Sequence, residues 1–194
     1  MGVNLDPDPL RQFEAWFDEA AATGMRAPEA VALATATPDG APSVRMVLMK
    51  GFDERGFTFF SNYESRKGQE LAVNPRAALL FHWDALGRQV RIEGPVGQLD
   101  PAESAEYILS RPRASQISAL ISPQSRPVES REWLEARVAE YERHDRVPLP
   151  DNWGGYRLAP QSYEFWQHRD DRLHDRVAYL PDESGAWRTQ RLAP

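Results

Sequence analysis

The chain of 194 residues contains no cysteine and no long hydrophobic run. The lack of cysteine excludes disulfides, a thiolate nucleophile and cysteine-ligated zinc, and it fits a reducing compartment. No apolar run approaches the roughly 18 residues that a membrane-spanning helix needs. The first ten residues, MGVNLDPDPL, lack the basic and apolar regions of a signal peptide. We therefore expect a cytoplasmic protein that does not contact a membrane.

Several motifs of catalysis are also absent. The sequence has no GxGxxG, no P-loop, no HExxH and no GxSxG. Its four histidines show no metal-ligand spacing with a carboxylate, so we expect no metal site: His82, His144, His168 and His174.

Lysine is scarce, and the net charge is negative. Of the 23 basic residues only Lys50 and Lys67 are lysine, which leaves 21 arginines. Codon bias in a GC-rich genome explains such a ratio, but not why these two lysines stayed. A net charge of −6 disfavours nucleic-acid binding, which depends on neutralising phosphates.

Hydrophobic periodicity predicts more strands than helices in one domain, residues 1–194. Helical spacing covers about 8–22 near the N-terminus, and a hairpin covers about 172–194 at the C-terminus. Most strands are joined by short turns, which favours a largely antiparallel sheet or barrel with helices outside, an α+β fold that is mainly β. The other expected elements are strands at 31–37, 43–50, 57–62, 76–83, 88–99 and within 153–166, and helices at 68–73, 100–110, 115–122 and 130–144.

Two segments early in the chain carry cations that could bind an anion. In RMVLMK, alternation places Arg45 and Lys50 on opposite faces of a strand, where both could simply be solvated edge residues. In SNYESRK, residues 61–67, hydroxyls and adjacent cations precede a helix. Free N–H groups at a helix N-terminus make such a segment suitable for a phosphate, although a capped helix with solvated charges is the alternative.

Two later segments have the same character. Tyr107 and Arg111 are four residues apart on one helix face, with Ser115 following, although Arg111 could simply interact with the helix dipole. In RLHDR, residues 172–176, strand geometry would point all three basic or titratable side chains to one face and Leu173 to the core. Together the segments indicate a ligand with two phosphate-sized ends and a flat middle, or two phosphorylated ligands.

The residues that carry these signals resemble one known family. The strings RMVLMK, FFSNYESRKG, RQVRIEGPV, SRPRASQISA, SPQSRPV, PLPDNWGGYRL, EFWQ, RLHDR and the terminal RLAP occur in order from about residue 8 onward. This combination is similar to the pyridoxamine/pyridoxine 5′-phosphate oxidases. The resemblance implies an FMN-binding split barrel, with an antiparallel barrel of six to eight strands, and a homodimer with FMN at the subunit interface.

The resemblance also implies roles for particular residues. Arg172 and His174 would be catalytic, orienting the substrate near its C4′ atom and moving a proton. Hydride would pass from C4′ to flavin N5, and O2 would reoxidise the flavin and give H2O2. The implied FMN contacts are Arg45, Met46, Val47, Leu48, Met49, Lys50, Phe60, Ser61, Arg66, Lys67, Gln89, Gln124, Ser125, Trp166 and Arg176. The implied contacts to the B6-phosphate substrate are Lys50, Tyr107, Arg111, Ser115, Arg172 and His174.

Two departures from the family pattern lie on the substrate side. The basic N-terminal arm is short or missing, and His168-Arg169-Asp170-Asp171 stands where glycine is usual. Two alternatives to the oxidase therefore stay open: a related flavin oxidase on another aromatic substrate, as in phenazine pathways, and a non-catalytic protein that binds flavin or B6 phosphate.

Overall fold

The computed structural model describes residue 3 and residues 5–194, and in this part of the chain nine strands form one antiparallel sheet. The strand order is β4-β1-β2-β3-β6-β5-β7-β8-β9. The strands are β1 (Ala30–Ala36), β2 (Pro42–Asp53), β3 (Gly56–Asn62), β4 (Arg76–Trp83), β5 (Arg88–Gln98), β6 (Trp153–Leu158), β7 (Ser162–Gln167), β8 (Asp175–Pro181) and β9 (Trp187–Arg191).

Six of these strands close into a barrel because β4 also pairs with β5. Strand β5 makes closure possible. It pairs with β4 from Arg88 to Pro95, with β7 through its first half and with β6 through its last three residues. Gly94 lies where these partners diverge, and a Cβ atom there would come 1.9 Å from the carbonyl oxygen of Ala159. Strands β7, β8 and β9 extend the sheet beyond the barrel, which confirms the predicted split-barrel fold.

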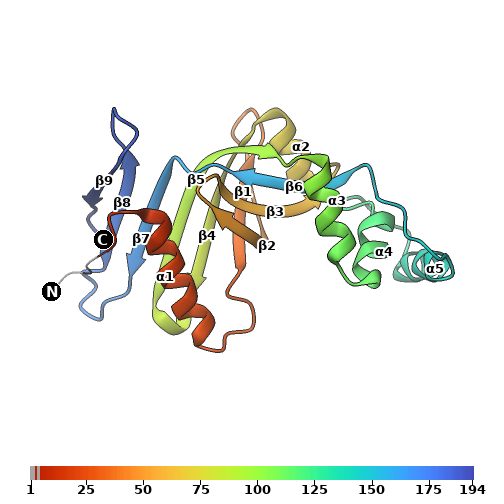
Figure 1. Ribbon diagram of the computed structural model, residues 1–194, viewed down its shortest axis with the longest axis horizontal. Coiled ribbons are helices and arrows are strands. Elements are labelled where there is room, and N and C mark those ends of the chain that lie inside the picture. Colours follow the sequence, from red (N-terminus) through yellow and green to blue (C-terminus); the bar gives the residue numbers. More distant parts are fainter. Residues whose placement is uncertain (1–2, 4) are drawn as a thin grey trace.

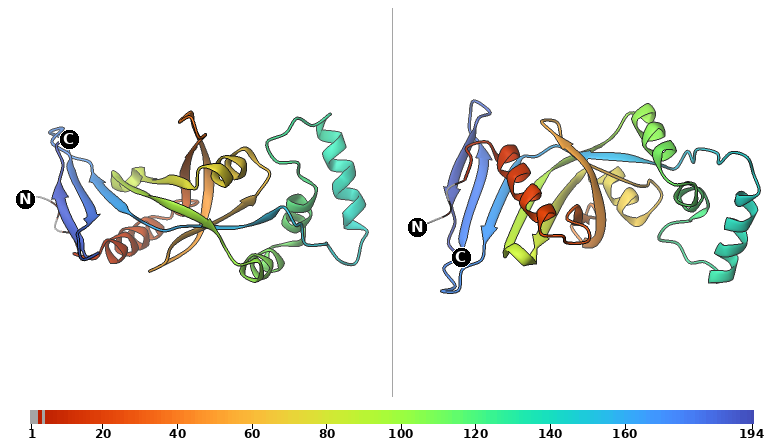
Figure 2. Two further views of the ribbon diagram at one scale, coloured as in Figure 1. Left: turned by 90° about the horizontal axis from the view of Figure 1, so that it is seen from above. Right: turned by 60° about the horizontal axis from the view of Figure 1, so that its bottom comes forward.

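Five helices accompany the sheet in the described residues: α1 (Pro9–Ala22), α2 (Arg66–Val73), α3 (Pro101–Ser110), α4 (Arg113–Ile121) and α5 (Arg131–Glu142). Figure 1 shows an elongated molecule with β7–β9 at one end, the barrel in the middle and α3–α5 at the other end. Both views in Figure 2 place α5 farthest from β9. Helix α5 buries none of its residues, although its sequence carries apolar side chains at helical spacing.

Helix α1 packs its apolar face on the barrel and helps to form the core. Asp8 caps it by accepting a hydrogen bond from the Leu10 amide at 2.8 Å. Phe13 is fully buried and meets Phe57 edge to face, with ring centroids 4.8 Å apart. Trp16 makes the same kind of contact with Phe165 at 5.3 Å. These contacts attach α1 to both the barrel and its extension.

The C-terminal hairpin differs from its predicted extent. Strand β8 begins at Asp175, so Arg172 and His174 precede the strand and do not share its face with Arg176. Arg172 has a φ of 65°, a left-handed conformation that strand geometry excludes. Leu173 is 67% exposed, so the prediction that it faces the core was wrong. The buried residue of this segment is Asp175, which forms ion pairs with Arg169 and Arg191.

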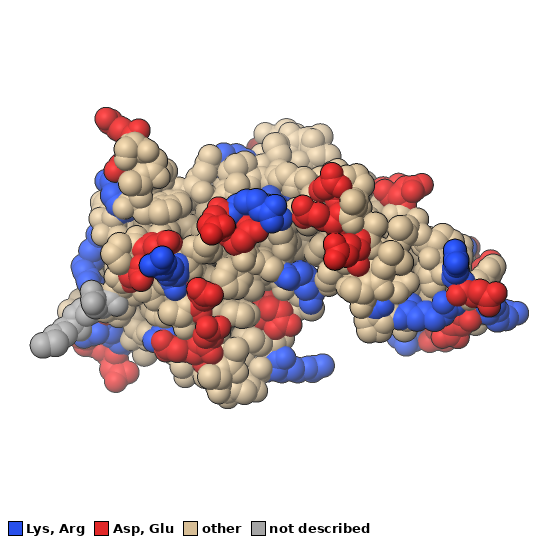
Figure 3. Space-filling view, viewed as in Figure 1, with Lys and Arg blue, Asp and Glu red and all other residues tan. Residues whose placement is uncertain are grey.

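The charge distribution on the surface and the length of the helices agree with what the composition predicts. On the face in Figure 3, acidic and basic side chains are interspersed without a large patch of one sign. No helix in the described residues is long and apolar enough to cross a membrane.

Candidate functional site

A cavity of about 230 Å³ between the barrel and α3 collects most of the residues predicted from the early segments. Strand β2 contributes one wall, the end of β3 and the start of α2 another, and the helical region a third. Its lining residues are Met46, Val47, Leu48, Lys50, Phe60, Ser61, Lys67, Tyr107, Arg111, Gln124 and Trp153.

Lys67 is the buried cation of this cavity. Its side chain projects from the first turn of α2, and the residue is only 8% exposed. The ammonium donates hydrogen bonds to Ser61 Oγ at 3.1 Å, Ser65 Oγ at 3.3 Å and Gln124 Oε1 at 2.9 Å. Burial, and secondarily the charge of Arg45, lower the pKa of Lys67 to about 8.

The partners of Lys67 are neutral. No ion pair in the described part of the chain involves it, although Arg45 and Arg66 nearby are both paired with Glu70. A buried ammonium without a carboxylate is costly unless an anion completes its environment. The cavity is therefore arranged to accept an anion beside the N-terminus of α2, where the helix dipole also favours negative charge.

Arg45, Arg66 and Glu70 form a network behind this cavity. Arg45 Nη2 lies 3.4 Å from Glu70 Oε2, and Arg66 Nε donates to Glu70 Oε1 at 2.9 Å. The hydroxyls of Thr35 and Ser43 also donate to Glu70 Oε2. Burial alone would raise the pKa of Glu70, but the bonds from Ser43, Thr35 and Arg66 and the charge of Arg45 outweigh it and lower the pKa to about 2.

Three stacked aromatic rings form another wall of the cavity. Phe60 and Tyr107 stack with ring centroids 3.8 Å apart, and Trp153 lies nearly parallel to Tyr107 at 6.1 Å. The guanidinium of Arg111 lies over the Trp153 ring, 5.1 Å from its centroid. Burial raises the pKa of Tyr107, while Arg111 acts against this shift, so the phenol stays protonated at neutral pH.

A second cleft, of about 270 Å³, holds another group of predicted residues on β5, β7 and β8. Gln89 is paired with Trp166, and Trp166 with Arg176, so the three side chains form one row across these strands. Arg176 donates to Glu164 Oε1 at 2.9 Å and to the carbonyl oxygen of Ala193 at 2.9 Å. This cleft shares no lining residue with the first cavity.

His174 lies beside this second cleft. Its ring is 4.7 Å from Trp166 and 5.2 Å from His168, measured between centroids. Arg172 is exposed in the preceding loop. The RLHDR segment therefore reaches Trp166 from a loop, and not from a strand face as the sequence predicted.

The remaining predicted residues lie outside both hollows. Met49 is buried in the core, 5% exposed. Ser115 lies in the first turn of α4, and Ser125 has a φ of 69° in the loop after it. Trp153 and Glu70 were not predicted as site residues. Glu70 is four residues after Arg66, a helical ion-pair spacing that would have indicated it.

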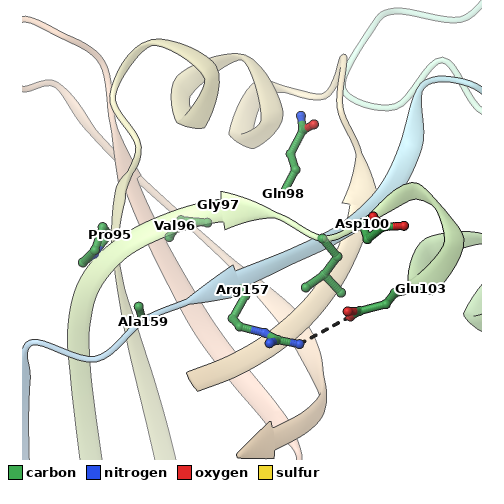
Figure 4. A pocket seen from close by; sticks show the side chains of 9 residues that line it. Pro95, Val96, Gly97, Gln98, Asp100, Glu103, Arg157 and Ala159 are labelled. Atoms are coloured by element: carbon green, nitrogen blue, oxygen red, sulfur yellow. Dashed lines mark hydrogen bonds and ion pairs between the residues drawn. The ribbon is translucent and has the colours of Figure 1, made fainter. Parts of the chain in front are cut away.

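The hollow drawn in Figure 4 is larger, about 490 Å³, and carries different chemistry. Its charged groups are already occupied: Arg157 pairs with Glu103 at 3.4 Å, and Asp100 caps α3. The structure holds no cluster of three metal-ligating side chains in residue 3 and residues 5–194.

Fold and site together define a protein of the split-barrel class, with a buried lysine in a cavity beside an aromatic wall. Residues 17–145 match the family described as pyridoxamine 5′-phosphate oxidase, and residues 153–194 match the pyridoxine 5′-phosphate oxidase C-terminal dimerisation region. The chain belongs to the pyridoxine/pyridoxamine 5′-phosphate oxidase family, and it is an enzyme.

Relatives and solved structures agree with this assignment. The pyridoxine/pyridoxamine 5′-phosphate oxidase of Rubrobacter xylanophilus is 56% identical over 192 residues, 97% of this chain and 88% of that protein. The enzyme of the same name from Janthinobacterium sp. is 53% identical over 194 residues, 99% and 92% of the two chains.

Among solved structures, PhzG from Burkholderia lata 383 in complex with tetrahydrophenazine-1-carboxylic acid has a TM-score of 0.92 at 35% identity, and the match covers 97% of this chain and 94% of PhzG. An FMN-binding protein from Nostoc punctiforme shares the fold, with a TM-score of 0.76 at 18% identity over 99% and 100% of the two chains.

Proposed function

We propose that this protein is an FMN-dependent oxidase that converts pyridoxine 5′-phosphate, pyridoxamine 5′-phosphate or both to pyridoxal 5′-phosphate. The observation that carries the proposal is the buried Lys67 ammonium, which has only neutral partners and lies in a cavity walled by the Phe60–Tyr107–Trp153 stack. A phosphate ester attached to a flat ring system fits both features.

The residues around Lys67 suit the phosphate of FMN. Lys67, Arg45 and Arg66 carry three positive charges, and Glu70 carries one negative charge, which leaves +2. That value complements a phosphate monoester, whose charge is about −1.5 to −2 at neutral pH. Ser61 and Gln124 add hydrogen-bonding groups at the same place.

A second group of residues that line the same cavity suits the phosphate of the substrate. Lys50, Tyr107 and Arg111 line it and supply an ammonium, a phenol and a guanidinium. Arg111, the extended C-cap residue of α3, is oriented by its contact with Trp153, and Ser115 lies four residues further on, in the first turn of α4. A guanidinium fork binds phosphate oxygens in pairs, so Arg111 would fix the orientation of the substrate as well as its charge.

When bound, FMN would supply the redox chemistry, accepting hydride from the substrate's C4′ at N5 and passing electrons to O2 to give H2O2. The protein would contribute placement and proton handling. Nδ1 of His174 accepts a hydrogen bond from the Arg169 amide at 3.1 Å. Its Nε2 is thus available to exchange a proton with the substrate's alcohol or amine, and Arg172 would orient that group.

We further propose that two copies of the chain share each site. The first cavity and the second cleft hold different parts of the set of predicted FMN contacts. An exposed apolar row connects them: Met46 (63% exposed) is paired with Ala32, and Ala32 with Leu80 (38% exposed). Met46 lines the first cavity and Leu80 the second cleft, so a partner that covers this row would also close both hollows.

The test follows the reaction with each phosphate ester first without oxygen and then in air. Protein loaded with FMN is mixed anaerobically with each phosphate ester, and bleaching of the flavin absorbance is followed. Air is then admitted, and pyridoxal phosphate and peroxide are measured. We expect bleaching with at least one ester and stoichiometric product. Bleaching with neither ester would contradict the proposal.

A second candidate function is the oxidation of a different aromatic substrate. The likeness to PhzG, with a TM-score of 0.92, favours it. So does the His168–Asp171 segment beside Trp166, where the family usually has glycine. Bleaching by a reduced phenazine carboxylate, together with inertness toward both phosphate esters, would establish this function instead.

A further inference from the structure

We propose that Glu70 is a positioning residue for phosphate binding: it holds Arg45 of β2 and Arg66 of α2 in the orientation that the phosphate of FMN requires. The inference rests on the proposed function and adds a residue to it. Glu70 is 5% exposed and faces away from solvent, so it acts through the two arginines and not on the ligand.

The carboxylate of Glu70 is fully engaged. Oε2 accepts from the Thr35 hydroxyl and from Ser43 Oγ at 2.5 Å, and it lies 3.4 Å from Arg45 Nη2. Oε1 accepts from Arg66 Nε at 2.9 Å. Every one of these partners is a donor, and they come from β1, β2 and α2. Glu70 therefore joins three separate elements at one buried point.

Arg45 and Arg66 depend on this point to different degrees. Arg45 has further acceptors, since its Nη1 donates to the Leu33 carbonyl oxygen at 3.1 Å and to Thr35 Oγ1 at 2.5 Å. The Arg66 side chain is 62% exposed, and it forms an ion pair with Glu70. Without Glu70, Arg66 would sample many rotamers. Phosphate binding would then have to restrict this side chain, and the lost conformational entropy would weaken the affinity.

Glutamine cannot replace the carboxylate here. In Glu70→Gln one of the two oxygens becomes an NH2 group, which is itself a donor. That NH2 group would face either Arg66 or the donors around Oε2. Two donors cannot hydrogen-bond to each other, so the bonds on one side of Glu70 would be lost. The net charge near Lys67 would rise from +2 to +3. If charge alone governed binding, this variant would bind phosphate more tightly; if Glu70 positions the arginines, it would bind less tightly.

The test compares FMN with riboflavin, which has the same ring system without the phosphate. The full-length chain is stripped of flavin and titrated with each ligand while flavin fluorescence is followed. For Glu70→Gln we expect the dissociation constant of FMN to rise about tenfold, as for the loss of one charge-assisted hydrogen bond. The constant of riboflavin should not change, whereas general damage to the fold would weaken both.

Two further variants complete the design. Glu135→Gln removes the carboxylate of a solvent-exposed i,i+4 pair with Arg131 and should leave both constants unchanged. Thr35→Val removes one donor to Glu70 without changing the charge, and it tests the same role if Glu70→Gln does not fold. We expect a smaller rise for FMN alone, about threefold.

Some results would overturn this role. Unchanged or tighter FMN binding in Glu70→Gln would do so, as would equal weakening of FMN and riboflavin in the folded variants. A wild-type chain that binds neither flavin would overturn the proposed function and this role together.

Discussion

The backbone amide of Arg169 donates a hydrogen bond to Nδ1 of His174 at 3.1 Å. Because Nδ1 is the acceptor, a neutral His174 carries its proton on Nε2. Both residues lie in the loop between β7 and β8, five positions apart, so the loop itself selects the tautomer. The Trp166 ring, whose centroid is 4.7 Å away and whose plane is tilted by 44°, restricts the imidazole further.

We therefore expect His174→Ala to lower turnover while leaving FMN bound. General acid–base catalysis contributes about 10²–10⁴-fold, so kcat should fall by about 10² or more. FMN occupancy, measured from the absorbance of the purified protein, should match that of the wild type. A variant with normal kcat would exclude proton transfer through His174.

Arg172→Ala should separate substrate binding from cofactor binding. Arg172 is exposed in the loop before β8 and does not line the cavity that holds Lys67. We expect kcat/KM for the phosphate ester to fall by about 10²-fold, as for loss of an orienting guanidinium. FMN occupancy should be retained. Arg172→Gly is the matched control for the φ of 65°, because glycine removes the same side chain and tolerates that conformation. Equal loss of flavin and turnover would show that Arg172 contacts the cofactor.

FMN affinity should depend on pH through Lys67. Below pH 8 its ammonium is charged in the folded chain; above pH 8 it becomes neutral, because burial lowers its pKa to about 8. Only the charged form attracts phosphate. The FMN dissociation constant should be flat from pH 7 to 8 and then rise by up to about tenfold per pH unit. Riboflavin should show no such rise. Titrations of both ligands in buffers of constant ionic strength test this, and a parallel rise for riboflavin would contradict it.

Much of this site was predictable from sequence because its residues are close in the chain. Ser61, Arg66 and Lys67 belong to one strand–helix junction, and local geometry places them together. Gln124 meets Lys67 across 57 residues, and only a resemblance to known proteins could pair them. The pairing of Glu70 with Arg45 needs the packing of α2 against the barrel. The left-handed turn at Arg172 could not be predicted. A basic residue carries no signal for a positive φ, and the alternation of polar and apolar residues typical of a strand continues through it.

Glu70 should also make the fold sensitive to acid. Its pKa is lowered from 4.5 to about 2 in the folded chain, so its stabilising contribution is complete above pH 4.5 and is lost as pH falls toward 2. A shift of this size corresponds to roughly 3 kcal/mol in the free energy of unfolding. Urea unfolding at pH 7 and at pH 3, followed by circular dichroism, measures the loss. Glu70→Gln should be less stable at pH 7 and should lose less between the two pH values. An identical pH dependence in the variant would show that other carboxylates dominate.

A mixture of two inactive variants should recover activity if each site is shared between two chains. Lys67→Ala removes a group from the first cavity, and Arg176→Ala removes one from the second cleft. Each variant alone should bind FMN weakly and turn over slowly, because both sites of its dimer are damaged. In a mixed dimer of two-fold symmetry, one site combines both damaged halves and the other is intact. Random pairing after unfolding and refolding together should thus give about a quarter of the wild-type activity. The same treatment of each variant alone is the control. If the mixture is no more active than its components, each site is built from a single chain, and the covering of Met46 and Leu80 by a partner needs another explanation.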